Sequence, residues 1–436
     1  MEQIKDYFRK ILPANFILWT HKLRGILAAL IYGSPAKNIR VIMVTGTNGK
    51  TTTCNMIAKI LEEANYKMAL ATTINFRINK KEWTNKTKMT TISPFALQKF
   101  IKEAVKANCH YLVLETTSHA IVQERVWGIK PTIAVLTNIT HDHLDYHKTP
   151  EEYREAKARI FAEAQTGILN MDDKSVTAFM RIPMPKTITY GAEGAERTRP
   201  ARPDILAKKI ILEATGSMFT VITPDSQVAI NLKLPGKFNI YNAVAALTVA
   251  YDLKINLNVV KDALESIDNI PGRMETIDMG QPFAVIIDYA HSPDALEKIY
   301  TTLEMAKRGK IIAVLGACGD RDRSKRPIMG ALAGRYADVV ILTNEDPYTE
   351  DPVKIIEEVA TGVPRGMGKS KVGGENLFKV LSRRDAIEKA FALAVKDDIV
   401  IITGKGAEEC MVVGHEKVPW SDKKVVKELL MKRREE

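Results

Sequence analysis

Residues 46–52, Gly-Thr-Asn-Gly-Lys-Thr-Thr, have the types and spacing of a loop that binds phosphate. Glycines allow backbone N–H groups to turn toward an anion, a helix start adds partial positive charge, and Lys50 supplies a full one. The Thr51 hydroxyl would hold Mg²⁺ beside the terminal phosphates. Val44 stands where the usual eight-residue pattern has its first glycine. Even so, the apolar run before the loop and the helical pattern after it favour phosphate binding over a plain turn, and hence chemistry driven by a nucleoside triphosphate.

A second group of polar residues follows two further apolar runs. Glu115 ends one run, and residues 137–147, Thr-Asn-Ile-Thr-His-Asp-His-Leu-Asp-Tyr-His, follow the next. Five of the eight histidines of the chain fall between positions 110 and 147. His141, His143 and His147 could be taken for a zinc site, but no cysteine or other ligand completes a tetrahedral set in an obvious way. A nucleotide nearby instead favours Mg²⁺ held by carboxylate, hydroxyl and phosphate oxygens.

The elements that would position these residues alternate along the chain. Apolar runs typical of buried strands cover residues 41–44, 111–115, 132–137, 283–288, 311–315, 339–343 and 399–403, and helical periodicity covers 52–64, 94–107, 292–306 and 386–395. This alternation predicts an α/β fold with mostly parallel sheets covered by helices on both faces, whose ligands gather at the carboxyl ends of the strands. Residues 208–234 predict a small antiparallel meander, and residues 268–279, with Pro-Gly-Arg, predict a hinge between two α/β units.

Composition limits the classes of protein that fit. A chain of 436 residues should form about two or three domains. Its net charge of +11 suits a polyanionic ligand, but no basic stripe is interleaved with aromatic residues, so nucleic acid is not an expected partner. Cys54, Cys109, Cys318 and Cys410 form no C-x-x-C pair, which fits core thiols in a reducing cytoplasm and predicts a cytoplasmic protein.

The amino-terminal stretch contains no secretory apolar region and no run long enough to cross a bilayer. Residues 4–32 mix apolar side chains such as Phe16 and Trp19 with cations such as Lys22 and Arg24. An amphipathic helical pair packed on the body of the protein is the favoured interpretation. A helix that lies on a membrane surface is the alternative.

The motifs of this chain resemble, in their order, those of a known family. They are GTNGKTT, ETTSH, TNITHDHLDYH and YREAKARIF, followed by GKFNIYN, PGRMETID, DYAHSPDALE, GDRDRSKRP, NEDP and GKGAEE, and they span residues 40 to about 410. This set resembles the ATP-dependent Mur ligases of peptidoglycan synthesis. The strings DYAHSPD, GDRDRSKRP and GKGAEE narrow the resemblance to the UDP-N-acetylmuramoyl-tripeptide synthetases of the MurE type, which add the third amino acid of the stem peptide.

The resemblance implies three parts: a short helical segment at residues 1–38 in place of a UDP-binding domain, a central P-loop ATP-binding domain at 39–270, and a Rossmann-like α/β domain at 271–436. It also implies a monomer that uses ATP with two Mg²⁺ ions and binds a nucleotide-sugar peptide and a free amino acid. An acyl phosphate would form on the peptide, and the amine of the amino acid would attack it.

Carried over by position, the resemblance assigns roles to individual residues. Lys50, His143, Lys157 and Arg273 would be catalytic, with Lys157 carbamylated so that its CO₂ adduct becomes a metal-bridging carboxylate. The metal ligands would be Thr51, Glu115, His143 and Lys157. ATP would be bound by Gly46, Thr47, Asn48, Gly49, Lys50, Thr51, Thr52, Asn242, Arg273, Asp288 and His291. The substrates would be bound by Thr90, Thr91, Ser118, Gln123, Arg125, Arg321, Asp346, Tyr348, Gly404 and Glu408.

The chain departs from this family in two places. About 40 residues precede the phosphate loop, too few for a conventional UDP-binding domain. Residues 345–348 read Glu-Asp-Pro-Tyr where the diaminopimelate-adding enzymes have Asp-Asn-Pro-Arg, so Tyr348 cannot pair with the distal carboxylate of that amino acid. Asp346 adds negative charge that would favour a bare ammonium. We therefore expect a diamino acid, with lysine favoured over diaminopimelate on electrostatics.

Three other functions remain open. A related ligase would act on folate, cyanophycin or an archaeal pseudomurein precursor, although folate-type members usually lack the DHLDYH and GDRDxxKRP strings. A non-catalytic nucleotide-binding subunit would have little reason to keep Lys50, Glu115, His143 and Lys157. A P-loop ATPase that drives motion would not need the carboxyl-terminal pocket residues. ATP hydrolysis that requires both a nucleotide-sugar peptide and a free amino acid would distinguish a ligase from these alternatives.

Overall fold

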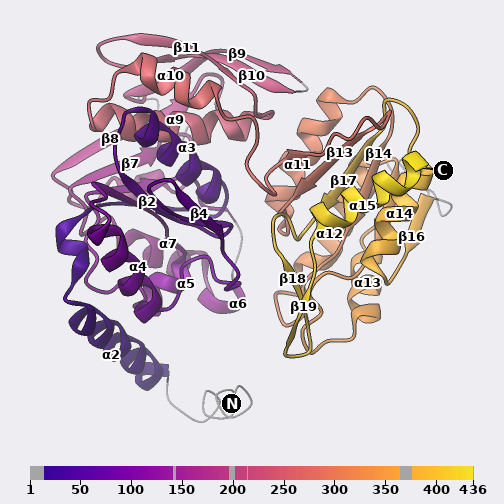
Figure 1. Cartoon of the computed structure of the whole chain (residues 1–436), viewed down its shortest axis with the longest axis horizontal. Coiled ribbons are helices and arrows are strands. Elements are labelled where there is room, and N and C mark those ends of the chain that lie inside the picture. The colour runs from indigo at the N-terminus through magenta and orange to yellow at the C-terminus, as the bar shows by residue number, and fades with distance from the viewer. Residues whose placement is uncertain (1–13, 141–143, 196–201, 214, 364–375, 436) are drawn as a thin grey trace.

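The computed structural model describes residues 14–140, 144–195, 202–213, 215–363 and 376–435. Within these ranges the chain forms two α/β bodies that lie side by side (Figure 1), the first built on an eleven-stranded sheet and the second on a six-stranded sheet. The expected α/β class with mostly parallel sheets is confirmed. None of the helices described is both long and apolar enough to span a bilayer.

The first sheet has the strand order β11-β10-β9-β8-β7-β6-β1-β5-β2-β3-β4. The run from β9 through β8, β7, β6, β1 and β5 to β2 is parallel throughout. The two ends of the sheet, β9-β10-β11 and β2-β3-β4, are antiparallel. The predicted meander at 208–234 thus extends this sheet. The bounds are β1 Arg40–Thr45, β2 Met68–Ala71, β3 Asn75–Ile78, β4 Lys81–Thr84, β5 Tyr111–Glu115, β6 Ile133–Leu136, β7 Thr166–Asn170, β8 Lys186–Ala192, β9 Ile205–Glu213, β10 Gly216–Ile222 and β11 Gln227–Leu232.

Helices cover both faces of the first sheet because successive residues of each buried strand point to opposite sides. In β1, Ile42 and Val44 pack with α3, α9 and α10, whereas Val41 and Met43 pack with α4 on the other face. The bounds are α3 Lys50–Glu63, α4 Pro94–Lys106, α5 Ser118–Val122, α6 Leu144–His147, α7 Pro150–Ala158, α8 Val176–Phe179, α9 Lys237–Asp252 and α10 Leu257–Glu265.

The second sheet has the strand order β12-β13-β17-β14-β15-β16, and only the short edge strand β12 is antiparallel. Helices α11, α12 and α13 contribute to the core on one face, and α14 and α15 to the core on the other. The bounds are β12 Glu275–Thr276, β13 Ala284–Asp288, β14 Ile311–Leu315, β15 Val339–Leu342, β16 Leu377–Lys379 and β17 Ile399–Thr403, with α11 Pro293–Ala306, α12 Lys325–Tyr336, α13 Pro352–Ala360, α14 Arg383–Leu393 and α15 Asp422–Glu435. A separate hairpin joins β18 Cys410–Val413 to β19 Glu416–Pro419.

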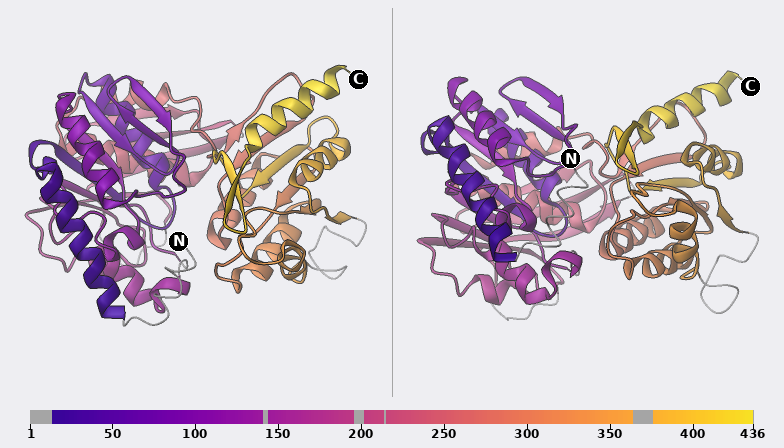
Figure 2. Two further views of the ribbon diagram at one scale, coloured as in Figure 1. Left: turned by 60° about the horizontal axis from the view of Figure 1, so that its bottom comes forward. Right: turned by 90° about the horizontal axis from the view of Figure 1, so that it is seen from below.

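The amino-terminal part contains one long helix, α2 Ala14–Tyr32, followed by the short 3₁₀ helix η1 Pro35–Asn38. The expected helical pair at 4–32 stays a prediction, because residues 4–13 lie outside the described residues. Helix α2 lies on the outer side of the first body, away from the second (Figures 1 and 2). No element of either sheet falls between 266 and 274, but the exact domain boundary at 270 stays a prediction.

Candidate active site

The loop between β1 and α3 contains two glycines that a side chain could not replace. Gly46 has a φ of 148° and Gly49 a φ of 83°, values that residues with a Cβ rarely adopt. A Cβ on Gly46 would lie 1.9 Å from Thr137 Oγ1, and one on Gly49 would lie 2.2 Å from Asn242 Oδ1. The loop is thus enclosed between the segment after β6 and helix α9, and α3 begins directly after it.

Thr51, Glu115 and Arg273 meet at the start of α3, beside Lys50. Lys50 Nζ donates to two carbonyl oxygens of the loop, at 3.0 and 2.8 Å. Thr51 Oγ1 lies 3.0 Å from both carboxylate oxygens of Glu115, the last residue of β5, and Arg273 Nη2 donates to the same hydroxyl at 3.0 Å. Two cations and a set of hard oxygen ligands therefore surround a helix N-terminus, which suits a triphosphate with Mg²⁺.

Lys157 lies on α7 and is only 1% exposed. Its Nζ donates to Gly46 O at 2.8 Å and lies 4.5 Å from the centre of the Tyr153 ring. The Tyr153 hydroxyl in turn hydrogen-bonds Thr47 Oγ1 at 3.1 Å. The lysine therefore contacts the phosphate loop instead of pointing into solvent, as its place in a charged helix would otherwise suggest.

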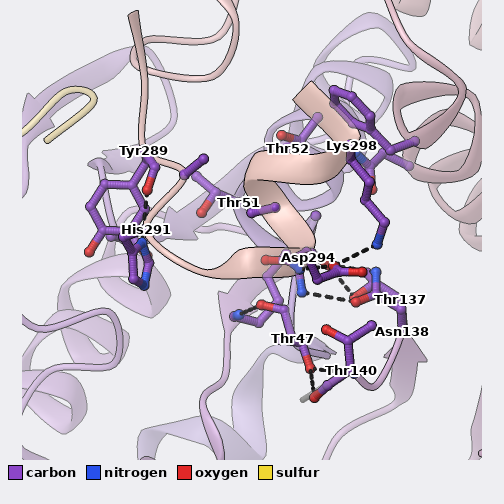
Figure 3. Close-up of a pocket in the computed structure, with 18 of the residues that line it drawn as sticks. Thr47, Thr51, Thr52, Thr137, Asn138, Thr140, Tyr289, His291, Asp294 and Lys298 are labelled. Carbon is purple, nitrogen blue, oxygen red and sulfur yellow. Dashed lines mark hydrogen bonds and ion pairs between the residues drawn. The ribbon is translucent and has the colours of Figure 1, made fainter. Parts of the chain in front are cut away.

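Residues of the second body approach the same loop. Figure 3 shows Tyr289, His291 and Asp294 around the backbone that carries Thr47 and Thr51. Asp294 Oδ2 accepts hydrogen bonds from Asn48 Nδ2 at 2.5 Å and from Lys298 Nζ at 2.7 Å (Figure 3). On the other side of the loop, Thr53 Oγ1 lies 3.3 Å from Oδ1 of Asn242, a residue expected from sequence to bind ATP and 189 positions away along the chain.

Asp288, one of these residues, also has a structural role. It is buried, and its carboxylate oxygens accept hydrogen bonds from the backbone N–H groups of Met274 and Ala290 at 2.7 and 2.6 Å. Burial raises the pKa of this carboxyl, while the guanidinium of Arg273 opposes the shift. Asp288 thus fixes the backbone that presents both Arg273 and His291.

A cavity of about 1650 Å³ joins the nucleotide loop to the residues expected to hold the peptide substrate. Its wall includes Thr90, Gln123 and Arg125, together with Ile17 and His21 of α2. Arg125 is fixed by hydrogen bonds to the carbonyl of Thr91 at 2.7 Å and to Gln123 Oε1. The guanidinium therefore has a defined position in the wall, where a carboxylate or phosphate of a substrate could meet it.

Two other expected substrate residues lie behind this wall. Thr91 Oγ1 donates to the carbonyl of Glu115 at 2.9 Å, and Ser118 Oγ lies 2.9 Å from His147 Nε2. His119, next in sequence, lines the cavity. Burial, with a smaller contribution from the neighbouring His147, lowers the pKa of His119 to about 4, so this imidazole is neutral at physiological pH.

The residues expected to bind the amino acid form a compact charged cluster. Lys405 Nζ lies 2.8 Å from Asp346 Oδ1 and 2.6 Å from Glu408 Oε2. Lys88, from the first body, reaches the same two acids, with distances of 2.9 Å to Asp346 Oδ2 and 2.5 Å to Glu408 Oε2. Two internal ammonium groups therefore already compensate the two carboxylates.

The pKa shifts agree with this geometry. Burial alone would raise the pKa of the Asp346 carboxyl, but the ammonium groups of Lys405 and Lys88 hold it below its ordinary value. Burial would likewise lower the pKa of Lys88, and the carboxylates of Glu408 and Asp346 raise it above its ordinary value. Asp346 and Lys88 thus keep their charges across neutral pH.

Tyr348 and Gly404 complete this pocket. The guanidinium of Arg321 lies 5.0 Å from the centre of the Tyr348 ring, and Arg321 also lines the large cavity. A Cβ on Gly404 would lie 2.2 Å from Glu345 Oε2, so only glycine fits there. Tyr348 therefore stands where the diaminopimelate-adding enzymes have an arginine. Its ring contacts a different arginine, Arg321, beside the pocket.

Sequence reasoning missed Lys88, although it lies two positions before the predicted Thr90. Its partners are more than 250 residues away, which no local pattern reveals. His143, the predicted catalytic and metal-binding histidine, lies outside the described residues. Within the ranges given above, no group of three or more His, Cys, Asp or Glu side chains is arranged to hold a metal ion.

A phosphate loop beside a cavity large enough for two substrates, with a second α/β body against it, is the architecture of a nucleotide-dependent ligase. The model of the Mur ligase middle domain matches residues 44–250, and that of the Mur ligase, glutamate ligase domain matches residues 272–406. The chain belongs to the Mur ligase family, which confirms the resemblance inferred from the sequence.

Comparisons with individual proteins agree with this family assignment. The UDP-N-acetylmuramoyl-L-alanyl-D-glutamate--2,6-diaminopimelate ligase of Bacillus cereus is 36% identical over 427 residues, which cover 96% of this chain and 83% of that protein. The UDP-N-acetylmuramyl-tripeptide synthetase of a Roseiflexus species is 38% identical over 411 residues, which cover 91% and 79%. A solved structure of a UDP-N-acetylmuramoyl-L-alanyl-D-glutamate--2,6-diaminopimelate ligase matches with a TM-score of 0.64 at 30% identity and covers 95% of this chain and 83% of that one.

Proposed function

We propose that this chain is a cytoplasmic, ATP-dependent ligase that adds a diamino acid to UDP-N-acetylmuramoyl-alanyl-glutamate in peptidoglycan synthesis. The observation that carries the proposal is the meeting of Thr51, Glu115 and Arg273 at the phosphate loop, on the wall of a cavity that also contains Arg125. A relative at 36% identity that is named a 2,6-diaminopimelate ligase and one at 38% that is named a tripeptide synthetase support it.

The residues at the loop suit the Mg²⁺ ions that the family uses. Thr51 and Glu115 are buried oxygen donors in direct contact, and oxygen donors are the ligands that Mg²⁺ prefers. Lys157 would add a carboxylate if carbamylated, and its nitrogen would then carry a single N–H in place of the ammonium that donates to Gly46 O. Bound Mg²⁺ would neutralise phosphate charge during transfer.

The roles of Lys50 and Arg273 follow from the negative charges of the two reacting groups. The peptide carboxylate of the substrate and the γ-phosphate of ATP repel each other, so Lys50 and Arg273 must offset that repulsion as the two approach. Transfer of the phosphoryl group gives an acyl phosphate and ADP. Attack by the amine of the amino acid then gives a tetrahedral species that expels phosphate. The hydrogen bond between Asn48 and Asp294 would help to hold the second body over the site and exclude water.

For the amino acid we favour diaminopimelate, in contrast to the expectation from sequence. The preference for lysine assumed that the negative charge of Asp346 was available to an ammonium, but Lys405 and Lys88 already neutralise it. Arg321, held on the Tyr348 ring, supplies a guanidinium for the distal carboxylate. The relatives named as diaminopimelate ligases support the same choice.

The test is phosphate release from ATP with UDP-N-acetylmuramoyl-alanyl-glutamate and a panel of single amino acids. We expect release with diaminopimelate, slower release with lysine, and none when either substrate is omitted. Faster turnover with lysine would overturn the choice of amino acid alone. No release with any amino acid would overturn the proposed acceptor.

A further inference from the structure

Helix α2 is apolar on two opposite sides. Its inner side packs on α4 and on the segment after α5, where a Cβ on Gly25 would lie 2.6 Å from Glu124 O and 2.7 Å from Trp127 Cβ. Ala28 and Ala29 on this side are fully buried. Small residues thus let the helix approach the body closely, and this contact accounts for one apolar side only.

The outer side exposes a stripe of large apolar side chains. Phe16, Trp19, Leu23, Leu27 and Leu30 have spacings of three and four, which places them in one row along the helix. They are 46%, 57%, 38%, 42% and 66% exposed. Because α2 lies on the outer side of the first body (Figures 1 and 2) and its opposite side packs on that body, the exposed stripe faces away from it.

Cations border the stripe. At about 100° per residue, Lys22 and Arg24 fall on opposite sides of the row, and both are exposed. Helix α2 contains no Asp or Glu. An apolar row bordered by cations whose alkyl stems can lie along it is the pattern of a helix at the surface of an anionic bilayer, with Trp19 suited to the interface.

We propose that the outer side of α2 binds the surface of an anionic phospholipid membrane. A second copy of the chain is a poor occupant, because two such stripes would bring Lys22 and Arg24 against the same cations of the other copy. A helix of 19 residues is about 28 Å long, so its stripe covers on the order of 300 Å², against roughly 800 Å² per partner in a stable protein interface. Binding to a bilayer does not require such an area, because the insertion of apolar side chains and the attraction of cations to anionic lipids both contribute to the affinity.

The same helix also contributes to the active-site cavity. Ile17 and His21 line it from the inner side of α2. Membrane binding would therefore hold the cavity close to the bilayer without occupying it. The inference does not depend on the proposed ligase activity, because vesicle binding can be measured with no substrate present.

The experiment is flotation of the full chain with vesicles of phosphatidylcholine alone or with phosphatidylglycerol added. We expect flotation with the anionic vesicles that falls as salt is raised. Leu23→Glu and Leu30→Glu should each weaken it about tenfold or more, since burial of a leucine side chain is worth at least that factor. The paired change K22Q/R24Q should weaken binding to anionic vesicles only. The matched control is Val395→Glu, at a 61% exposed valine on the second body, which should bind as wild type.

Thermal unfolding of each variant shows whether it is folded, and light scattering after gel filtration gives the mass in solution. Flotation that the two leucine variants retain would overturn the proposal. So would a chain that does not bind vesicles but is a dimer that Leu30→Glu dissociates, because a second copy would then cover the stripe. A monomer that binds neither kind of vesicle would overturn it as well.

Discussion

Lys88 Nζ lies 2.9 Å from Asp346 Oδ2, and this ion pair joins the two bodies of the molecule at the expected amino-acid pocket. Lys88 follows β4 in the loop that continues to Thr90 and Thr91, whereas Asp346 follows β15. The lysine side chain is 12% exposed and the aspartate 6%. A change in the loop expected to hold the peptide substrate would therefore reach the expected pocket for the amino acid directly.

Lys88→Met should reduce the preference for diaminopimelate over lysine. The variant leaves Lys405 as the one ammonium group, among the described residues, that is paired with Asp346 and Glu408, so the pocket loses one positive charge and repels a second carboxylate. We expect the ratio of kcat/KM values for the two amino acids to fall about tenfold. The matched control is Lys86→Met, which removes another pair between the bodies, with Glu409 at 3.6 Å and a lysine 77% exposed. It should change the ratio by less than about twofold, and equal losses in both variants would contradict the role of Lys88.

Glu115→Gln should abolish most activity without unfolding the protein. The amide keeps the shape of the side chain but loses the negative charge that faces Thr51 Oγ1 at 3.0 Å. We expect kcat to fall about 10²- to 10³-fold, the range seen when one electrostatic contribution to a transition state is removed. Steady-state turnover at several Mg²⁺ concentrations measures this. Glu63→Gln, at a 45% exposed side chain of the same first body, should retain wild-type turnover.

Asp422→Asn should destabilise the second body strongly. Asp422 is fully buried and accepts hydrogen bonds from Arg383 Nε at 2.8 Å and Nη2 at 2.7 Å, which ties α15 to α14. Removing one partner leaves a buried guanidinium without its counter-charge, so the free energy of unfolding should fall by roughly 3 kcal/mol. Urea denaturation measures the change. Glu428→Gln, which breaks the exposed Arg384–Glu428 pair between the same two helices, should cost less than about 0.5 kcal/mol.

His119 should make stability depend on acid pH. Its pKa is about 4 in the folded chain, below the ordinary 6.5, so between these values the unfolded chain binds more protons. Stability is therefore complete above about pH 6.5 and is lost as the pH falls toward 4, by up to about 3 kcal/mol. His119→Gln removes this contribution, and chemical denaturation at pH 7 and pH 5 should show a smaller loss for the variant than for wild type. Identical losses would show that His119 is not the group responsible.

The local sequence pattern was enough to predict those elements that have strong residue preferences or a continuous apolar run. The phosphate loop and helix α3 were predicted because glycine, lysine and threonine have strong local preferences there. Strands β5, β14 and β17 were predicted to the residue because fully buried parallel strands are continuous apolar runs. Strands β7 and β8 were missed, since Thr166–Asn170 and Lys186–Ala192 mix polar and apolar residues and owe their place in the sheet to pairing with neighbours.

The sequence by itself determined the family, the phosphate loop and the identity of part of the cavity wall, because these depend on residue type and order. Only the tertiary structure decided the charge of the amino-acid pocket. Asp346 and Tyr348 suggested a pocket for a bare ammonium, but Lys88 changes that environment from a position that no local spacing connects to it. Electrostatic energy depends on distance in space, and the fold brings residues 258 positions apart to within 2.9 Å.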